Sequence, residues 1–165
     1  MQKVEYNRNA AVEYATKWAL GRNSNYYDFE KLGGDCTNFA SQSIFAGAGV
    51  MNYSYPLGWF YISPFERAPS WTSVQYLQNY LLRKEKSVGP FGKFDTLANL
   101  ELGDVVQVQT NGIYTHTLVI TKIEGRGNKP FDFLICAHTY DALNRRLSTY
   151  NLKNAKFIKI LGVYK

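Results

Sequence analysis

The sequence predicts an α+β fold in which helices from the first half of the chain pack on an antiparallel sheet from the second half. Two observations support this prediction. Residues 6–81 contain apolar residues at helical spacing, whereas residues 105–164 contain short β-rich runs separated by turns. A length of 165 residues fits one domain covering residues 1–165.

The first two helices follow from apolar spacing and from residues typical of helix ends. Apolar positions predict a helix over residues 6–20, with Asn7 as its N-cap and Gly21 at its end. After a polar, tyrosine-rich loop, small and apolar residues predict a second helix over residues 37–48. Cys36 is expected in the first turn of this second helix.

Residues 50–70 are rich in proline and aromatic residues, and we expect an irregular segment that borders a groove. A third helix is expected after it, with Ser70 or Ser73 as its N-cap and an apolar stripe ending at Leu81.

The second half of the chain has the short runs and turns of an antiparallel sheet. Asn111-Gly112 is a strong signal for a hairpin turn, and residues 125–130 form the next turn. The expected strands are residues 105–108, 114–123, 131–138 and 157–164.

Composition and charge exclude several classes of protein. The chain is 45% hydrophobic and 19% charged, which excludes intrinsic disorder, and its apolar runs are too short to span a bilayer. A net charge of +6 favours anionic partners such as wall polymers. The basic residues are scattered and lack an RNA-binding aromatic motif, so we expect no specific nucleic-acid partner.

Two cysteines, Cys36 and Cys136, are too few for a disulfide framework or a four-thiolate zinc site. A single disulfide between them stays open, although Cys136 is expected to be a buried core thiol. The first residues contain no apolar stretch of signal-peptide length.

Cys36 is the candidate nucleophile, because a glycine turn leads it into a helix N-terminus that stabilises a thiolate. Gly33 and Gly34 permit close approach of a substrate, and the N–H of Cys36 is a candidate oxyanion donor. Asp35 is a candidate helix cap, but its charge raises the thiol pKa, so a nearby cation is needed. The alternative is an inert core cysteine.

His116 begins a strand and shares a face with Leu118 and Ile120, from which its ring is expected to reach Cys36 as a general base. His138 ends the next strand, so antiparallel pairing is expected to bring the two histidines together. One would then orient the other, with Asp141 as a competing orienter. A zinc site of two histidines with Asp141 or Cys36 is the metal alternative.

Aromatic residues have two interpretations. Trp18, Phe39 and Phe45 fit the buried faces of helices. Trp59, Tyr61 and Trp71 also fit a core, but they are alternatively candidates to line a substrate groove.

Five sequence blocks together resemble the amidase domain family of bacterial surface and secreted proteins over nearly the whole chain. They are Tyr6–Ala15, Gly33-Gly34-Asp35-Cys36-Thr37-Asn38-Phe39-Ala40-Ser41-Gln42, Leu102-Gly103-Asp104-Val105, His116–Ile120 and Ala137–Asp141. The chain is more distantly similar to cell-wall cysteine peptidases of the NlpC and CHAP types, in which an Asp-Cys pair opens a helix and a histidine begins a strand.

This resemblance implies a papain-like cysteine amidase or peptidase with Cys36 as nucleophile, His116 as base and His138 as third member. It implies peptide or N-acyl amide substrates of the bacterial wall, an extracellular or cell-surface location and no cofactor. A monomer is expected. The rival hypothesis is a catalytically silent module that binds wall glycan or teichoic polymer through tyrosines, Trp59, Trp71 and basic side chains.

Overall fold

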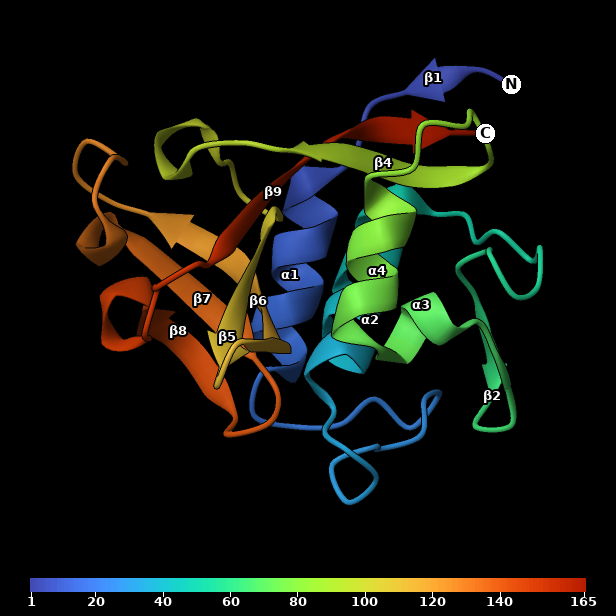
Figure 1. Ribbon diagram of the computed structural model, residues 1–165, viewed down its shortest axis with the longest axis horizontal. Helices are drawn as coiled ribbons and strands as arrows, with labels where there is room; N and C mark the ends of the chain where they lie inside the picture. The colour runs from blue at the N-terminus through green and yellow to red at the C-terminus, as the bar shows by residue number, and fades with distance from the viewer.

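A computed structural model describes residues 1–165 and confirms the α+β class. Helices pack against a seven-stranded sheet in which all paired strands are antiparallel. Figure 1 shows α1 and α2 side by side in the middle of the molecule, with the loop that joins them below and both chain termini at the top.

The first two helices lie close to their expected positions. Helix α1 spans Arg8–Trp18, and the side chain of Asn7 caps it by accepting a hydrogen bond from the N–H of Ala10. Helix α2 spans Cys36–Ala48 and ends at Gly49, whose left-handed φ of 67° suits glycine. Nearly all of α2 is buried, because α1 packs on one side of it and the sheet on another.

The third expected helix is divided into two. Helix α3 spans Pro69–Thr72 and α4 spans Val74–Leu81, because Ser73 between them has an extended backbone. Neither expected serine caps through its side chain: Ser70 instead donates to the carbonyl of Gly58.

The central strands pair in the order β1-β9-β5-β6-β7-β8, and β4 pairs with the other edge of β9. The Asn111-Gly112 turn joins β5 to β6 as expected, with positive φ at both residues. The strands are β1 Lys3–Val4, β4 Gly89–Phe94, β5 Val105–Thr110, β6 Ile113–Ile123, β7 Phe133–Ala137, β8 Ala142–Arg146 and β9 Lys156–Tyr164. A separate hairpin joins β2, Tyr61–Ser63, to β3, Glu66–Arg67.

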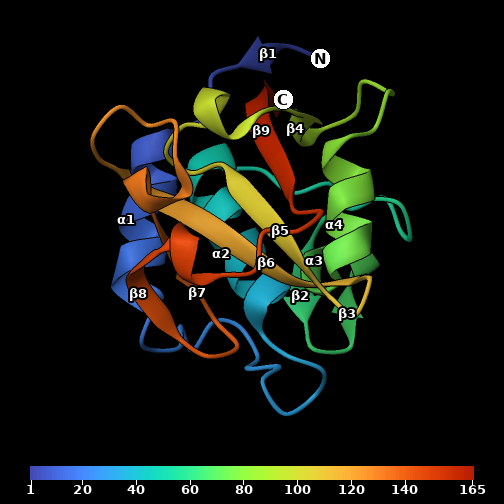
Figure 2. The ribbon, with the colours of Figure 1, turned by 60° about the vertical axis from the view of Figure 1, so that its left-hand side comes forward.

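Two hydrophobic clusters cover the two faces of this sheet, and they determine where the candidate site residues point. Val119 of β6 and Cys136 of β7 belong to the cluster formed with the helices. Leu118 and Ile120 of β6 belong to a second cluster with the residues around Leu147. Figure 2 shows β5, β6 and β7 crossing in front of α1 and α2, so the second cluster lies on the face turned away from these helices.

A buried ion pair joins α1 to the sheet. Arg8 donates to Asp104 at 2.7 Å and to the carbonyl of Ile160 at 2.7 Å. Burial raises the pKa of Asp104, and the adjacent guanidinium partly offsets this effect. Since Tyr6 also donates to the carbonyl of Gly103, these motif residues hold the fold together.

Candidate functional site

A glycine turn delivers Cys36 as the first residue of α2. Gly33 and Gly34 have φ of 97° and 102°, a region that glycine adopts without strain. A Cβ on Gly34 would lie 2.9 Å from Oγ1 of Thr139, so the turn also packs tightly against the loop after β7. The N–H of Cys36 has no partner within the helix, because it belongs to the first turn.

The Cys36 sulfur lies against the backbone on either side of His116. Its thiol donates to the carbonyl of Thr115 at 3.6 Å, and the N–H of Thr117 donates to the sulfur. The pairing of β6 with β7 reaches only from Ile123 to Val119 at this end. The thiol therefore sits beside the stretch of β6 that projects past the paired part of β7.

The environment of Cys36 favours the protonated thiol. The side chain is only 5% exposed, and this burial raises its pKa. Hydrogen bonds from Thr117 and Thr37 partly oppose the effect, while the charge of Asp35 raises the pKa further. The expectation that the helix N-terminus lowers the pKa of the Cys36 thiol is therefore not met in this structure, where burial dominates.

His116 shares a face with Leu118 and Ile120 as expected, but this is the face turned away from the helices. Its ring centroid lies 6.0 Å from that of Tyr150, and no hydrogen bond joins the ring to Cys36. Burial, and then the charge of Arg145, lower its pKa to about 4. The ring is consequently neutral at neutral pH.

An open cavity of about 560 Å³ lies beside His116 and the glycine turn, and Cys36 itself does not line it. Its lining includes Gly33 of the glycine turn, together with Thr115 and His116 of β6. Thr139 and Tyr140 from the loop after β7 complete this side of it. A substrate in this cavity would contact both the glycine turn and the histidine.

His138 lies on the other face of the sheet, buried between the strands and the helices. Its Nδ1 is 2.5 Å from Oδ2 of Asp35, its Nε2 is 2.8 Å from the carbonyl oxygen of Trp18, and its ring stacks on Phe39. His116 thus lies near the start of β6 and His138 directly follows β7, but their side chains point to opposite faces of the sheet. No hydrogen bond joins them, and no cluster of metal-binding side chains forms, so the two-histidine zinc alternative finds no ligand set.

Asp35 has a different role from the expected helix cap. It occupies the N-cap position, but its carboxylate makes no cap hydrogen bond. Oδ1 instead accepts from the N–H of Phe29 and from the side chain of Asn38, while Oδ2 faces His138. Asp35 therefore ties the loop before α2 to the end of β7.

No sequence motif marks Arg22, which lies in the polar loop between α1 and α2. It makes a bidentate pair with Asp141 at 2.8 and 3.1 Å, and it also lies near Asp28 and Nε2 of His138. Although burial opposes it, the hydrogen bond and charge of Asp141 raise the pKa of Arg22. Asp141 thus pairs with an arginine and orients neither histidine directly.

Both cysteines are free, so the Cys36–Cys136 disulfide is not formed. Cys136 is fully buried as expected, and its thiol lies 3.6 Å from Oγ1 of Thr121. This leaves Cys36 available for chemistry.

The aromatic groove interpretation is wrong for three residues and correct for the segment. Trp59 and Trp71 are fully buried and Tyr61 is 8% exposed, so all three belong to the core. The segment does border a cavity of about 350 Å³, which neither Cys36 nor a histidine lines. Its lining residues are Tyr53, Tyr55, Phe60, Ile62, Phe65, Glu66 and Arg67.

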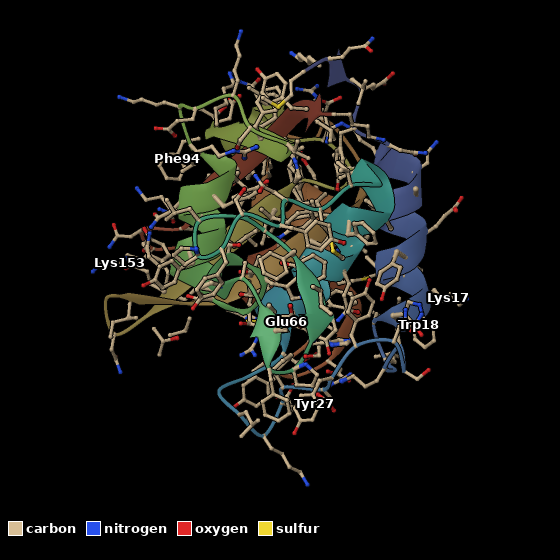
Figure 3. All side chains as sticks on the ribbon, turned by 90° about the vertical axis from the view of Figure 1, so that its right-hand side faces the viewer. Lys17, Trp18, Tyr27, Glu66, Phe94 and Lys153 are labelled. Carbon is tan, nitrogen blue, oxygen red and sulfur yellow. The ribbon has the colours of Figure 1, made fainter.

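The view with all side chains places this hairpin relative to the loop that joins α1 and α2. Figure 3 shows Glu66 in front of the helices and Tyr27 at the lower end of the molecule. Trp18 and Lys17 lie at the right-hand edge of this view, at the lower end of α1. Trp59 and Trp71, the two tryptophans proposed for polymer binding, are fully buried and inaccessible to a polymer, which removes their part of the rival hypothesis. No helix has the length and apolar character needed to cross a membrane.

Comparisons with known proteins place the chain in a family. Residues 5–161 match the family model described as "Putative amidase domain". The chain is 30% identical over 146 residues to "Uncharacterized protein YhbB" of Bacillus subtilis (strain 168), covering 86% of this chain and 44% of that protein.

It is also 32% identical over 129 residues to "Uncharacterized protein YjcM" of the same organism, covering 70% of this chain and 28% of that protein. The chain thus spans less than half the length of these curated relatives. No solved structure matches it. The match to nearly the whole chain shows that it belongs to the "Putative amidase domain" family.

Proposed function

We propose that this protein is a papain-like cysteine hydrolase of amide bonds, with Cys36 as the nucleophile and His116 as the general base. The observation that carries the proposal is the position of the Cys36 thiol at the start of α2, against the backbone of β6 that carries His116. Acyl transfer requires a nucleophile, a base that can reach it and donors for the oxyanion, and Cys36, His116 and the unpaired N–H of Cys36 are the candidates for these roles.

The reaction begins with a protonated thiol and a neutral imidazole. The His116 ring starts on the opposite face of the sheet from the thiol, and the β6–β7 pairing stops at Val119, so the proposal requires the ring to swing around this free edge of β6 to reach the thiol. His116 then takes the thiol proton as sulfur forms a bond to the amide carbonyl carbon. The N–H of Cys36 donates to the resulting oxyanion.

Collapse of this intermediate breaks the carbon–nitrogen bond. The imidazolium of His116 gives its proton to the leaving amine, which leaves an acyl thioester on Cys36. His116 then takes a proton from water as the water oxygen attacks the thioester. The products are a carboxylic acid and the free thiol, with the imidazole again neutral.

In this proposal His138 is the third member, but as a positioning residue that acts through Asp35. Its ring holds the Asp35 carboxylate, and Asp35 directly precedes Cys36 in the turn that presents the thiol. Fixing the side chains around a nucleophile is how such third members contribute to rate.

Amide bonds of bacterial cell-wall peptides are the proposed substrates, which would place the domain outside the cell. The net charge of +6 supports this proposal, since it attracts anionic wall polymers. The cavity of about 560 Å³ beside His116 has the volume of a site for a substrate of small-molecule or short-peptide size.

The test is the release of new amino groups from purified wall fragments. The wild-type protein and Cys36→Ala are compared, with Cys136→Ala as the matched control for loss of a buried thiol. We expect release by the wild type and by Cys136→Ala, and none by Cys36→Ala. Equal release by Cys36→Ala would overturn the assignment of the nucleophile, and no release by the wild type would overturn the wall substrate.

A further inference from the structure

The cavity beside His116 has an unbalanced positive charge. Arg145 lines it, whereas no aspartate, glutamate or lysine does. Arg145 is exposed on β8, and its charge reaches the histidine, because it contributes to the low pKa of His116. A charge near a reacting group in a partly enclosed site selects ligands of the opposite sign.

Arg145 has no carboxylate partner within the protein. Its Nε donates to Oγ1 of Thr149 at 2.7 Å, and its guanidinium packs 4.3 Å over the ring of Tyr150. These contacts orient the side chain without neutralising it. The Nη1 group makes no hydrogen bond within the protein, so donors remain free for a ligand.

The next residue shows that this arrangement is particular to Arg145. Arg146 pairs with Glu124 at 2.7 Å and donates to the carbonyl of Phe131 at 2.8 Å. One of two adjacent arginines is thus internally satisfied, and the other faces the cavity. Arg146 is therefore a matched control for the loss of one positive charge on β8.

We infer that Arg145 determines specificity by binding a carboxylate of the substrate, so that the preferred amide carries a free carboxylate close to the bond that is cut. This inference rests on the proposed function and names its substrate class. A guanidinium pairs with a carboxylate through parallel hydrogen bonds, which fix orientation as well as provide affinity. The bound carboxylate would hold the amide in the cavity, between the glycine turn and His116.

Binding is measured in the Cys36→Ala variant, which keeps the cavity and cannot form the acyl thioester. The probes are N-acetylglycine and N-acetylglycinamide, which differ only in a carboxylate. The readout is the pKa of the His116 ring followed by NMR, with its signals assigned by their absence in His116→Gln. We expect N-acetylglycine to raise this pKa, because its charge offsets that of Arg145, and N-acetylglycinamide to leave it unchanged.

Substitution of Arg145 then tests the residue itself. Arg145→Gln should weaken N-acetylglycine binding by about tenfold or more. Arg145→Lys should retain part of the affinity, since it keeps the charge but loses the fork, and Arg146→Gln should bind as the parent does. Equal effects of the two probes, or unchanged binding in Arg145→Gln, would overturn the inference.

The outcome is independent of catalysis. If carboxylate binding fails while amine release from wall fragments still requires Cys36, then only the role of Arg145 falls. If binding succeeds while neither the wild type nor any variant releases amines from wall fragments, then the wall substrate falls and the carboxylate site stands.

Discussion

Nδ1 of His138 lies 2.5 Å from Oδ2 of Asp35, and this contact joins residues that are 103 positions apart in the chain. It connects the end of β7 to the turn that begins α2. Both side chains are almost completely buried, so if one of them is removed, water does not take its place as a partner of the other. The contact therefore fixes the residue that precedes the candidate nucleophile.

Replacing His138 by alanine should destabilise the fold. The change leaves the buried Asp35 carboxylate without its closest partner, which we expect to lower the free energy of unfolding by about 2–4 kcal/mol. Urea unfolding measures the loss. Asp141→Asn is the control, because its partly exposed pair with Arg22 is worth about 1 kcal/mol or less. Equal losses in the two variants would contradict a buried role for His138.

Cys36 should react with iodoacetamide only at high pH. Burial raises the pKa of its thiol, and alkylation requires the thiolate. The alkylation rate should therefore increase only at pH values above the ordinary thiol pKa of about 8.5. Mass spectrometry of the folded protein between pH 6 and 10 locates the modified residue. Cys136 is the internal comparison, since it is fully buried and should stay unmodified. Rapid labelling of Cys36 at pH 6 would contradict a protonated resting thiol.

His116 should make the protein less stable in acid. Its pKa is about 4 in the folded state against an ordinary 6.5, so between these values the unfolded chain binds a proton that the folded chain does not. The titration of His116 therefore leaves the free energy of unfolding unchanged above pH 6.5 and lowers it as the pH falls toward 4. Urea unfolding of wild type and His116→Asn at pH 4.5 and 7.5 measures it. A difference between the two proteins that does not change with pH would contradict the lowered pKa.

Trp71 should be a core residue rather than part of a binding surface. It is fully buried and its ring lies 4.9 Å from that of Trp59, so Trp71→Ala should cost about 3–5 kcal/mol of stability. Phe65→Ala is the control, because Phe65 is 99% exposed and its loss should change stability by about 0.5 kcal/mol or less. Urea unfolding compares them, and a small loss for Trp71→Ala would show that the core assignment is wrong.

Local patterns explain how much of the fold could be predicted. The N-cap at Asn7, the start of α2 at Cys36 and the Asn111-Gly112 hairpin all depend on neighbouring residues, and all three are confirmed. Strands β4 and β8 were missed because proline, glycine and polar residues weaken their signal. Both are held by pairing with distant strands, which a local pattern does not contain.

The candidate site shows the same limit. Alternation along β6 correctly placed His116 on the face of Leu118, but it could not tell which face the helices cover. Strand pairing brings His116 and His138 to the same end of the neighbouring strands β6 and β7. Side chains alternate between the two faces along a strand, and the register places these two rings on opposite faces. Arg22 and the Asp35–His138 contact depend on loop packing, which leaves no periodic signal in the sequence.

Acylation by p-nitrophenyl acetate tests whether His116 activates Cys36, because it requires no knowledge of the natural substrate. The measurement is the initial release of nitrophenolate at pH 7.5, with the acetyl group located by mass spectrometry. We expect an acetyl thioester on Cys36 that forms in wild type and Cys136→Ala, forms much more slowly in His116→Ala and is absent in Cys36→Ala. Acetylation at another residue, or an unchanged rate in His116→Ala, would contradict a nucleophile at Cys36 that His116 activates.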